Sequence, residues 1–170
     1  MTAAPRRCRK SIQLSGKGRR AGAALGAVSA GLLVLSACDK PTPLATVTVG
    51  TNSVNAEAAC YADGDTVPNK KIASCVEKKP DATIKMAQGD TLRLGVEPAI
   101  AETGWVLYLN GAPALNEPYK KTYRSFAGID LFASQTGGPA AKSVKLSILE
   151  VDANGKYKGA WNFKIEKDNG

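Results

Sequence analysis

The sequence predicts an all-β fold, an antiparallel β-sandwich, for the part of the chain after residue 44. Apolar residues recur at every second position in several short segments, which is the spacing of half-buried strands. Turn-forming pairs such as Asn110-Gly111 and Asn154-Gly155 separate these segments, and almost no stretch has the period of a helix. These observations favour an immunoglobulin-like arrangement of about seven or eight strands, with a small β-barrel as the alternative.

The first expected strands are short. Residues 45–49 have the sequence Ala-Thr-Val-Thr-Val, which alternates apolar and hydroxyl side chains as a half-buried strand does. Residues 55–61 fit either a strand or the start of a helix, and a loop-rich stretch is expected from there to Cys75. Strands are expected next at residues 83–87 and 91–96, with Gly89-Asp90 turning the chain between them.

The middle and the last third of the chain continue the alternation. Residues 105–109 are expected to form a strand that ends in a hairpin at Asn110-Gly111, with Trp105 filling the core. Residues 119–126 and 129–133 are expected to be further short strands. The alternation is clearest at residues 144–148 and 161–165, on either side of the turn at Asn154-Gly155.

The N-terminal segment, residues 1–37, has the layout of a secretory signal peptide. The chain carries a formal net charge of +8, but seven of its 23 Lys and Arg residues precede Cys38, where no acidic residue occurs. An uncharged apolar run follows at residues 21–35, too short for a stable membrane span of about 20 residues. From Cys38 onward sixteen basic residues are balanced by fifteen acidic ones, so no nucleic-acid partner is expected.

The tetrapeptide Leu35-Ser36-Ala37-Cys38 directly follows the apolar run. It resembles the lipobox of bacterial lipoproteins, which implies that Cys38 receives a diacylglyceryl group and becomes the N-terminus after cleavage. Two acyl chains anchor a protein lastingly, whereas one chain is marginal. We therefore expect the protein to be held at the extracytoplasmic face of the cell membrane, with residues 38–44 as a lipidated N-terminus and a proline-containing spacer. The pair Arg19-Arg20 leaves both Sec and twin-arginine export open.

The mature chain is expected to form one domain over residues 45–170. Of the four cysteines, Cys8 is removed and Cys38 is lipidated, which leaves Cys60 and Cys75. In an oxidising compartment these two are expected to form a disulfide. Redox-active pairs usually lie two residues apart, so a structural bridge is favoured over an extracytoplasmic redox sensor.

Three segments of the mature chain carry a resemblance to a known family: residues 38–49, residues 118–125 (Pro-Tyr-Lys-Lys-Thr-Tyr-Arg-Ser) and residues 134–137 (Ser-Gln-Thr-Gly). They resemble an actinomycete family of small lipoproteins that is catalogued as a domain of unknown function. The resemblance extends over most of the mature chain, and it implies lipid anchoring and a single domain. It brings no active site, so no functional residue is carried over.

The residue types that are present restrict the chemistry of the domain. The chain has no histidine, which removes the commonest general base and the commonest metal ligand. No cofactor or metal is expected, because Asp63-Gly64-Asp65 lacks the further oxygen ligands of a calcium loop and is expected to be a turn. Carboxylates could still serve a small glycan hydrolase of the envelope, whose two carboxyl groups must lie close together. The candidates are Glu97, Glu102, Glu117 and Asp130.

One segment is a candidate binding surface, with three cations beside two tyrosines. Its candidate residues are Tyr119, Lys120, Lys121, Tyr123 and Arg124. Charge and stacking together could bind an anionic envelope polymer or an envelope protein. The alternative is an edge strand whose lysines prevent aggregation. The leading expectation is therefore a non-enzymatic binding or accessory module, with the glycan hydrolase and the redox sensor as alternatives.

Overall fold

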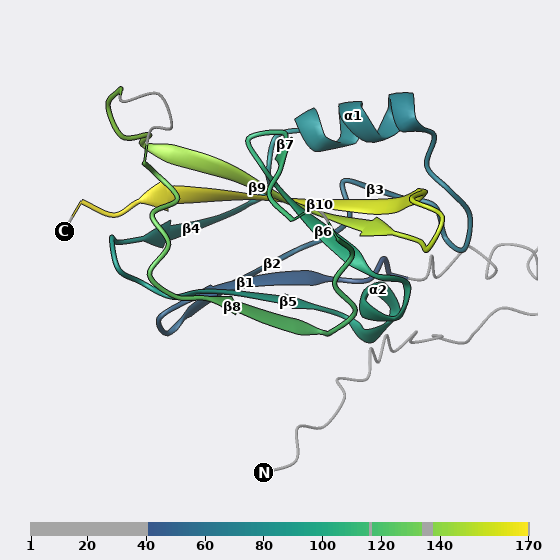
Figure 1. Cartoon of the computed structure of the whole chain (residues 1–170), viewed down its shortest axis with the longest axis horizontal. Helices are drawn as coiled ribbons and strands as arrows, with labels where there is room; N and C mark the ends of the chain where they lie inside the picture. The colour runs from purple at the N-terminus through teal and green to yellow at the C-terminus, as the bar shows by residue number, and fades with distance from the viewer. Residues whose placement is uncertain (1–40, 116, 134–137, 170) are drawn as a thin grey trace, which may run out of the picture. The chain divides into compact units, whose positions relative to one another are not determined.

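The structure, a computed structural model, describes residues 41–115, 117–133 and 138–169, which belong to one compact unit, Lys40–Gly170. The predicted signal peptide and Cys38 lie outside the described residues. Two β-sheets are stacked face to face, with helix α1 (Asn69–Glu77) on the outer side of one of them (Figure 1). The predicted β-sandwich with an immunoglobulin-like arrangement is confirmed, and the sheets do not close into a barrel within the described chain.

The first sheet has four strands in the order β2-β1-β5-β8, all of them paired antiparallel. Val47 and Leu94 lie opposite each other and are fully buried on the core side, while Thr46 and Thr48 alternate with them on the outer side. The strands are β1 (Ala45–Val49), β2 (Asn52–Ala56), β5 (Leu92–Val96) and β8 (Tyr123–Phe126).

The second sheet has six strands in the order β3-β10-β9-β6-β7, with β4 beside β10. The strands are β3 (Cys60–Tyr61), β4 (Ala82–Met86), β6 (Trp105–Leu109), β7 (Ala112–Pro113), β9 (Ser143–Val151) and β10 (Tyr157–Lys167). β4 runs parallel to β10, with Ala82 opposite Phe163. Among the described strands this pair is the one departure from the predicted antiparallel pattern.

The core lies between the inner faces of the two sheets. Trp105, Trp161 and Phe163 are its largest fully buried side chains, and the position of Trp105 is as predicted. The indole N–H of Trp161 donates a hydrogen bond of 2.7 Å to the carbonyl oxygen of Pro43. The folded part of the chain therefore begins within the predicted spacer, because Pro43 is already tied to β10.

Both predicted turns are present. Asn110 and Gly111 have φ angles of 49° and 82°, the positive values that a tight hairpin turn of this kind requires. The turn joins β6 to β7, which pair antiparallel. At the second turn the carboxylate of Asp152 accepts hydrogen bonds from the backbone N–H groups of Asn154 and Lys156, and β9 and β10 then pair along most of their length.

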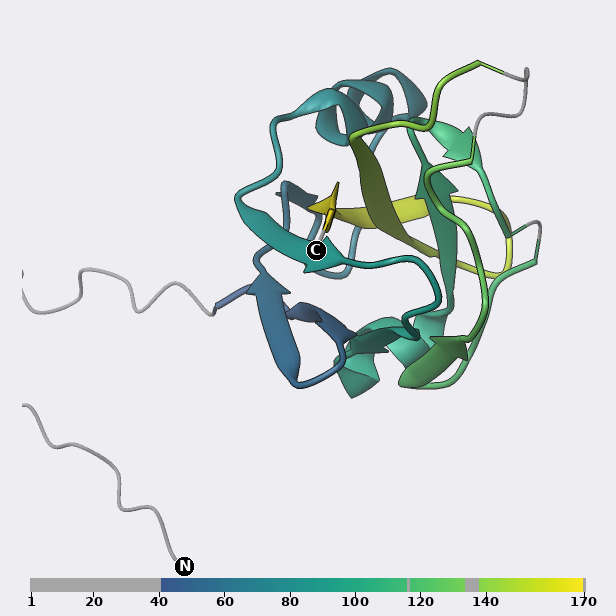
Figure 2. The same cartoon turned by 90° about the vertical axis from the view of Figure 1, so that its left-hand side faces the viewer.

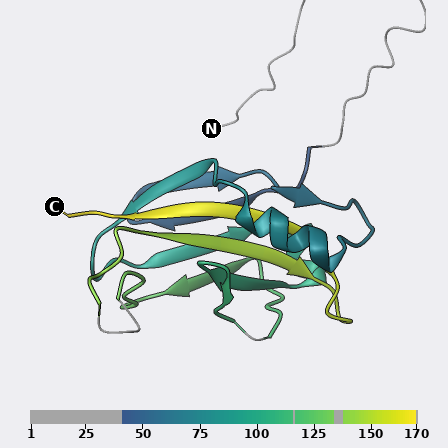
Figure 3. The ribbon, with the colours of Figure 1, turned by 90° about the horizontal axis from the view of Figure 1, so that it is seen from above.

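Helix α1 replaces the loop-rich stretch that the sequence predicts before Cys75. The helix begins after Pro68, and its apolar residues Ile72, Cys75 and Val76 recur at the spacing of one helical face. This face packs on the outer side of the second sheet, and Figure 3 shows the helix lying over β9 and β10. The loop prediction is wrong here because a helix of nine residues gains its stability from the sheet that it covers, which the local sequence does not show.

The predicted disulfide between Cys60 and Cys75 is present, with the two Cα atoms 5.8 Å apart. It joins the short edge strand β3 to α1. On the outer face of β9 and β10, Leu149 and Ala160 are buried under the helix. The bridge therefore holds the helix over a second apolar layer on the outer face of this sheet.

A second helix, α2 (Pro98–Thr103), lies between β5 and β6, in a stretch where the sequence predicts no strand. Pro98 opens the helix, where its missing N–H costs nothing and its fixed φ suits the first turn. Gly104, with a φ of 117°, ends it. Ile100 and Ala101 are buried against the core, which keeps so short a helix in place.

The predicted strand at residues 119–126 is wrong in its first half. Tyr119 pairs with Trp105 of the second sheet through two backbone hydrogen bonds of 2.8 and 3.1 Å. Tyr123–Phe126 pairs instead with β5 of the first sheet. The chain crosses from one sheet to the other at residues 120–122, and alternation along the sequence does not reveal this change of partner.

The predicted strand at residues 129–133 is absent. The carboxylate of Asp130 accepts a hydrogen bond of 3.0 Å from the backbone N–H of Phe132, which bends the chain locally. Phe132 is buried, so this apolar residue is a loop side chain that is anchored in the core and not part of a strand.

Candidate ligand pocket

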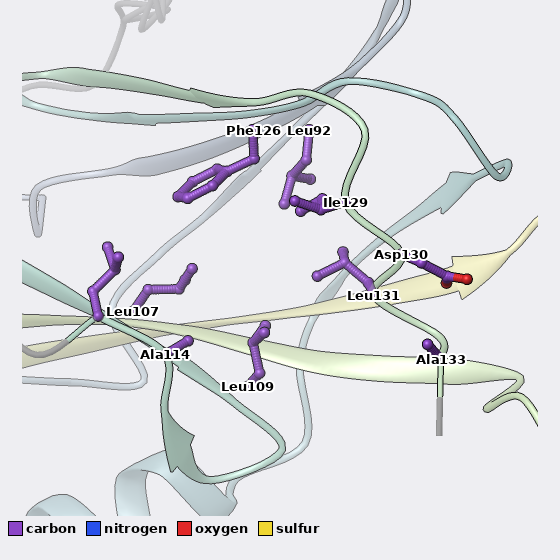
Figure 4. Close-up of a pocket in the computed structure, with 10 residues that line it drawn as sticks. Leu92, Leu107, Leu109, Ala114, Phe126, Ile129, Asp130, Leu131 and Ala133 are labelled. Atoms are coloured by element: carbon purple, nitrogen blue, oxygen red, sulfur yellow. The ribbon is translucent and has the colours of Figure 1, made fainter. Parts of the chain in front are cut away.

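An apolar pocket with a volume of about 360 Å³ opens between the two sheets. Leu92 of β5 and Phe126 of β8 form one wall, and Leu107 and Leu109 of β6 form the opposite wall. Figure 4 shows these side chains pointing toward one another from the two sheets. In Figure 2, which views the sandwich from one end, the green chain after β8 runs along one side of the sandwich, from the first sheet toward the second.

The loop after β8 closes the pocket on a third side. Ile129 and Leu131 line it, and they belong to the segment that the sequence assigns to a strand. Phe132 anchors this wall, because its side chain is buried and its carbonyl oxygen accepts a hydrogen bond of 2.9 Å from the backbone N–H of Ala141. The pocket is therefore bounded by two sheets and by an anchored loop.

The lining determines what the pocket can hold. Asp130 is the only ionisable residue among the described residues that line it, and its carboxylate points away from the apolar side chains (Figure 4). Pockets of about 300–1,000 Å³ with an apolar lining are typical of small-molecule sites. When an apolar group leaves water for such a pocket, its burial favours binding by about 25 cal/mol of free energy per Å² of apolar surface. The pocket thus suits an apolar group.

Sequence reasoning did not find this pocket. Its walls come from β5, β6, β8 and the loop that follows, and the space between them depends on how far apart two sheets lie. The apolar residues of 129–133 are a local signal for one wall, but they indicate a short strand and not the lining of a pocket.

The predicted binding surface at residues 119–124 is divided by the fold. The ring of Tyr119 packs edge-on against Trp105, with centroids 5.3 Å apart and an interplanar angle of 82°. The guanidinium of Arg124 lies 4.9 Å from the centroid of Tyr119 and 5.1 Å from that of Phe126. Tyr119 and Arg124 therefore serve the packing of the domain.

The remaining residues of that surface are exposed. Lys120 and Lys121 lie in the crossing between the sheets, and the carbonyl oxygen of Lys121 accepts a hydrogen bond of 2.9 Å from the indole N–H of Trp105. Tyr123 is 52% exposed, the most exposed of the large apolar side chains in the described chain. Two lysines and one tyrosine are thus free for a partner, fewer than the sequence suggests.

The four candidate carboxylates are distributed over the chain. Glu97 directly precedes α2 and makes no side-chain hydrogen bond to the start of that helix, and Glu102 lies within α2. Glu117 precedes the bridge at Tyr119, and Asp130 lies in the pocket loop. These carboxylates come from three separate segments and are all exposed.

The predicted turn at Asp63-Gly64-Asp65 is present. Gly64 has a φ of 77°, and the backbone N–H of Asp65 donates a hydrogen bond of 2.7 Å to the carbonyl oxygen of Ala62. The side chain of Asp65 accepts a hydrogen bond from the backbone N–H of Thr66. Within the described ranges, no group of three or more acidic, cysteine or histidine side chains could hold a metal ion.

A buried carboxylate was missed by sequence reasoning. Glu150 of β9 is only 4% exposed, and its Oε2 atom has no hydrogen-bond partner among the described residues. Burial raises the pKa of this carboxyl group above its ordinary value, although a hydrogen bond from Thr103 and the charge of Lys158 oppose the shift. The signal was the alternation of β9, which places position 150 on the core side with Ile148.

The lipid anchor stays a prediction. Cys38 lies outside the described residues, and no helix in the described part of the chain is long and apolar enough to cross a membrane.

Comparisons with known proteins place the chain in no family. No family model matches it, and no curated protein matches it. Among solved structures the chain is similar to the fibronectin(III)-like modules of Clostridium thermocellum CbhA, with 9% sequence identity and a TM-score of 0.36. The match covers 54% of this chain and 92% of that one. The assignment of the fold rests on the strand order described above and not on this likeness.

Proposed function

We propose that this chain is a cell-envelope lipoprotein, anchored outside the cytoplasmic membrane, that binds an apolar ligand between its two sheets without catalysing a reaction. The pocket of about 360 Å³ carries the proposal, since its lining is apolar and its one ionisable residue points away from it. All four candidate carboxylates are exposed to solvent, whereas a carboxyl group that serves as a catalytic acid or base is typically buried, which supports the non-enzymatic part of the proposal.

The anchor and the domain would lie close together. Thr42 accepts a hydrogen bond of 3.3 Å from the backbone N–H of Ala58, and Pro43 is bonded to Trp161. Pro43 lies five positions after Cys38, and an extended chain advances at most about 3.6 Å per residue. A lipidated Cys38 would therefore keep the folded domain within about 18 Å of the membrane surface.

The proposed occupant is a single alkyl or acyl chain that carries a neutral or cationic head group. The walls are formed by aliphatic side chains and one phenyl ring, which match an alkyl chain. Asp130 lies at the pocket and would repel an anionic head group. A protein anchored at the membrane lies next to lipids that carry such chains, so the predicted location would supply the ligand.

The test uses the full chain and three probes with the same alkyl chain: dodecyl maltoside, dodecylamine and laurate. Ala114 lines the pocket and is exposed, so Ala114→Trp is designed to fill the pocket. Ala153 is exposed in the turn between β9 and β10, and Ala153→Trp adds the same side chain there. Titration calorimetry measures the affinity of each probe for each variant.

We expect dodecyl maltoside and dodecylamine to bind more tightly than laurate, and Asp130→Asn to reduce this difference. Ala114→Trp is expected to weaken alkyl-chain binding about tenfold or more, while Ala153→Trp leaves it unchanged. If none of the probes binds, or if the two tryptophan variants bind them equally well, the proposed ligand site is wrong. Binding of an apolar peptide in place of the alkyl probes would also contradict the proposed occupant.

A further inference from the structure

A second hollow, with a volume of about 520 Å³, lies on the outer face of the six-stranded sheet beside the C-terminal end of α1. It has no carboxylate among its described lining residues, although the mature chain has nearly as many acidic as basic residues. The polar residues that line it are Lys79, Thr83, Asn110, Ser143, Lys145 and Lys164. Three ammonium groups therefore share one concave surface.

Two of these lysines are held side by side. Lys145 on β9 lies directly opposite Lys164 on β10, and opposed like charges on neighbouring strands repel each other. Lys145 Nζ donates a hydrogen bond of 2.7 Å to the carbonyl oxygen of Lys78, and Lys164 Nζ lies 2.7 Å from Glu166 Oε1. Each ammonium carries three N–H donors, so two remain on each lysine after these contacts.

The strand under Lys145 is fixed in position. The backbone N–H of Lys145 donates a hydrogen bond of 2.9 Å to the side-chain oxygen of Asn110. In return, the backbone N–H of Asn110 donates a hydrogen bond of 2.8 Å to the carbonyl oxygen of Lys145. Asn162 of β10 donates a buried hydrogen bond of 2.8 Å to the carbonyl oxygen of Cys75 in α1. The sheet and the helix therefore form a rigid support for the cations.

The environment of Lys145 already disfavours its charge. Partial burial lowers the pKa of Lys145, and the charge of Glu77 opposes the shift only in part. An anion in the hollow would offset this desolvation and the repulsion between Lys145 and Lys164 at the same time.

We propose that this hollow binds a phosphate group, either as the free anion or within a phosphodiester. Lysines act as point charges toward phosphate, whereas a planar carboxylate is typically bound by the fork of an arginine, and none of the described lining residues is arginine. The hydroxyl groups of Thr83 and Ser143 add neutral donors at the same surface. The site is independent of the apolar pocket, which lies on the opposite side of the second sheet.

The test titrates the full chain with inorganic phosphate at constant ionic strength. Lys79→Gln/Lys164→Gln removes two of the cations in the hollow, and Lys120→Gln/Lys121→Gln removes the same charge from exposed positions elsewhere. We expect the first pair to weaken phosphate binding about tenfold and the second pair to change it less than about twofold. The amide resonance of Lys145 is expected to shift on binding, which places the ligand in the hollow.

The source of the phosphate is distinguished by vesicles. Binding to phosphatidylglycerol vesicles but not to phosphatidylcholine vesicles, with the same dependence on Lys79 and Lys164, identifies a lipid head group. Binding of inorganic phosphate alone identifies a free anion. Phosphate binding that both lysine pairs weaken equally, or its absence altogether, overturns the proposal. If the double variant loses the circular dichroism of the folded chain, Lys79→Gln alone replaces it, since Lys79 is exposed.

Discussion

The indole N–H of Trp105 donates a hydrogen bond of 2.9 Å to the carbonyl oxygen of Lys121, at the point where the chain crosses from one sheet to the other. Just before the crossing, Tyr119 is paired with the backbone of Trp105. Just after it, Tyr123 begins the strand that pairs with β5. One buried side chain thus fixes the start of β8, which carries Phe126 into the wall of the apolar pocket.

Trp105→Phe removes this hydrogen bond and part of a buried ring. We expect the free energy of unfolding to fall by about 1–3 kcal/mol, measured by urea denaturation. Because β8 loses a tether, the affinity for dodecyl maltoside should fall as well. The matched control is Trp161→Phe, which loses the bond to Pro43 and should lower stability without changing that affinity. Equal affinity in both variants would contradict the role given to Trp105.

Tyr119 and Tyr123 should respond differently to truncation. Tyr119→Ala removes a ring that packs on Trp105 and lies under the guanidinium of Arg124, so a loss of about 2–4 kcal/mol is expected. Tyr123→Ala removes a side chain that is 52% exposed, and stability should change by no more than about 0.5 kcal/mol. Thermal unfolding of both variants checks this contrast. Equal destabilisation would show that the exposed tyrosine has a packing role after all.

The disulfide between Cys60 and Cys75 should stabilise the domain by closing a short loop. With a sequence separation of 15, the chain-entropy model gives about 3 kcal/mol. The variant Cys60→Ser/Cys75→Ser should therefore unfold at a lower urea concentration than the oxidised parent protein. Reductant should lower the unfolding midpoint of the parent protein and leave that of the variant unchanged. An identical midpoint with and without reductant in the parent protein would be inconsistent with a structural bridge.

Glu150 predicts a dependence of stability on pH. Its pKa in the folded state is raised above the ordinary value of 4.5, so the folded protein holds this proton more tightly than the unfolded chain does. The contribution is stabilising below pH 4.5 and is lost as the pH rises through the folded-state pKa. Glu150→Gln should thus be more stable than the parent at neutral pH, on the order of 1 kcal/mol.

The pH series supplies the control for this prediction. The difference between Glu150→Gln and the parent should shrink toward zero as the pH falls below 4.5, because both side chains are then neutral. Glu102→Gln, an exposed substitution on α2, should show no such trend. An advantage of Glu150→Gln that stays constant from acid to neutral pH would point to packing and not to charge.

Strands whose two faces differ are predicted from the sequence alone. β1 and β5 alternate because one face of each meets the core, and this period is visible without any neighbour. The turn at Asn110-Gly111 was equally evident, since few residue pairs accept two positive φ angles. The disulfide followed from the count of cysteines together with the expected export of the chain.

The pairing of the strands, in contrast, is evident only in the folded chain. Residues 119–126 have one local pattern, yet Tyr119 pairs with one sheet and Tyr123 with the other. The outer apolar layer under α1 depends in the same way on the sheet that supports it, because a short helix gains most of its stability from the surface it covers. Both candidate sites are spaces between segments distant in sequence, and the size of such a space depends on packing, which no local pattern of residues encodes.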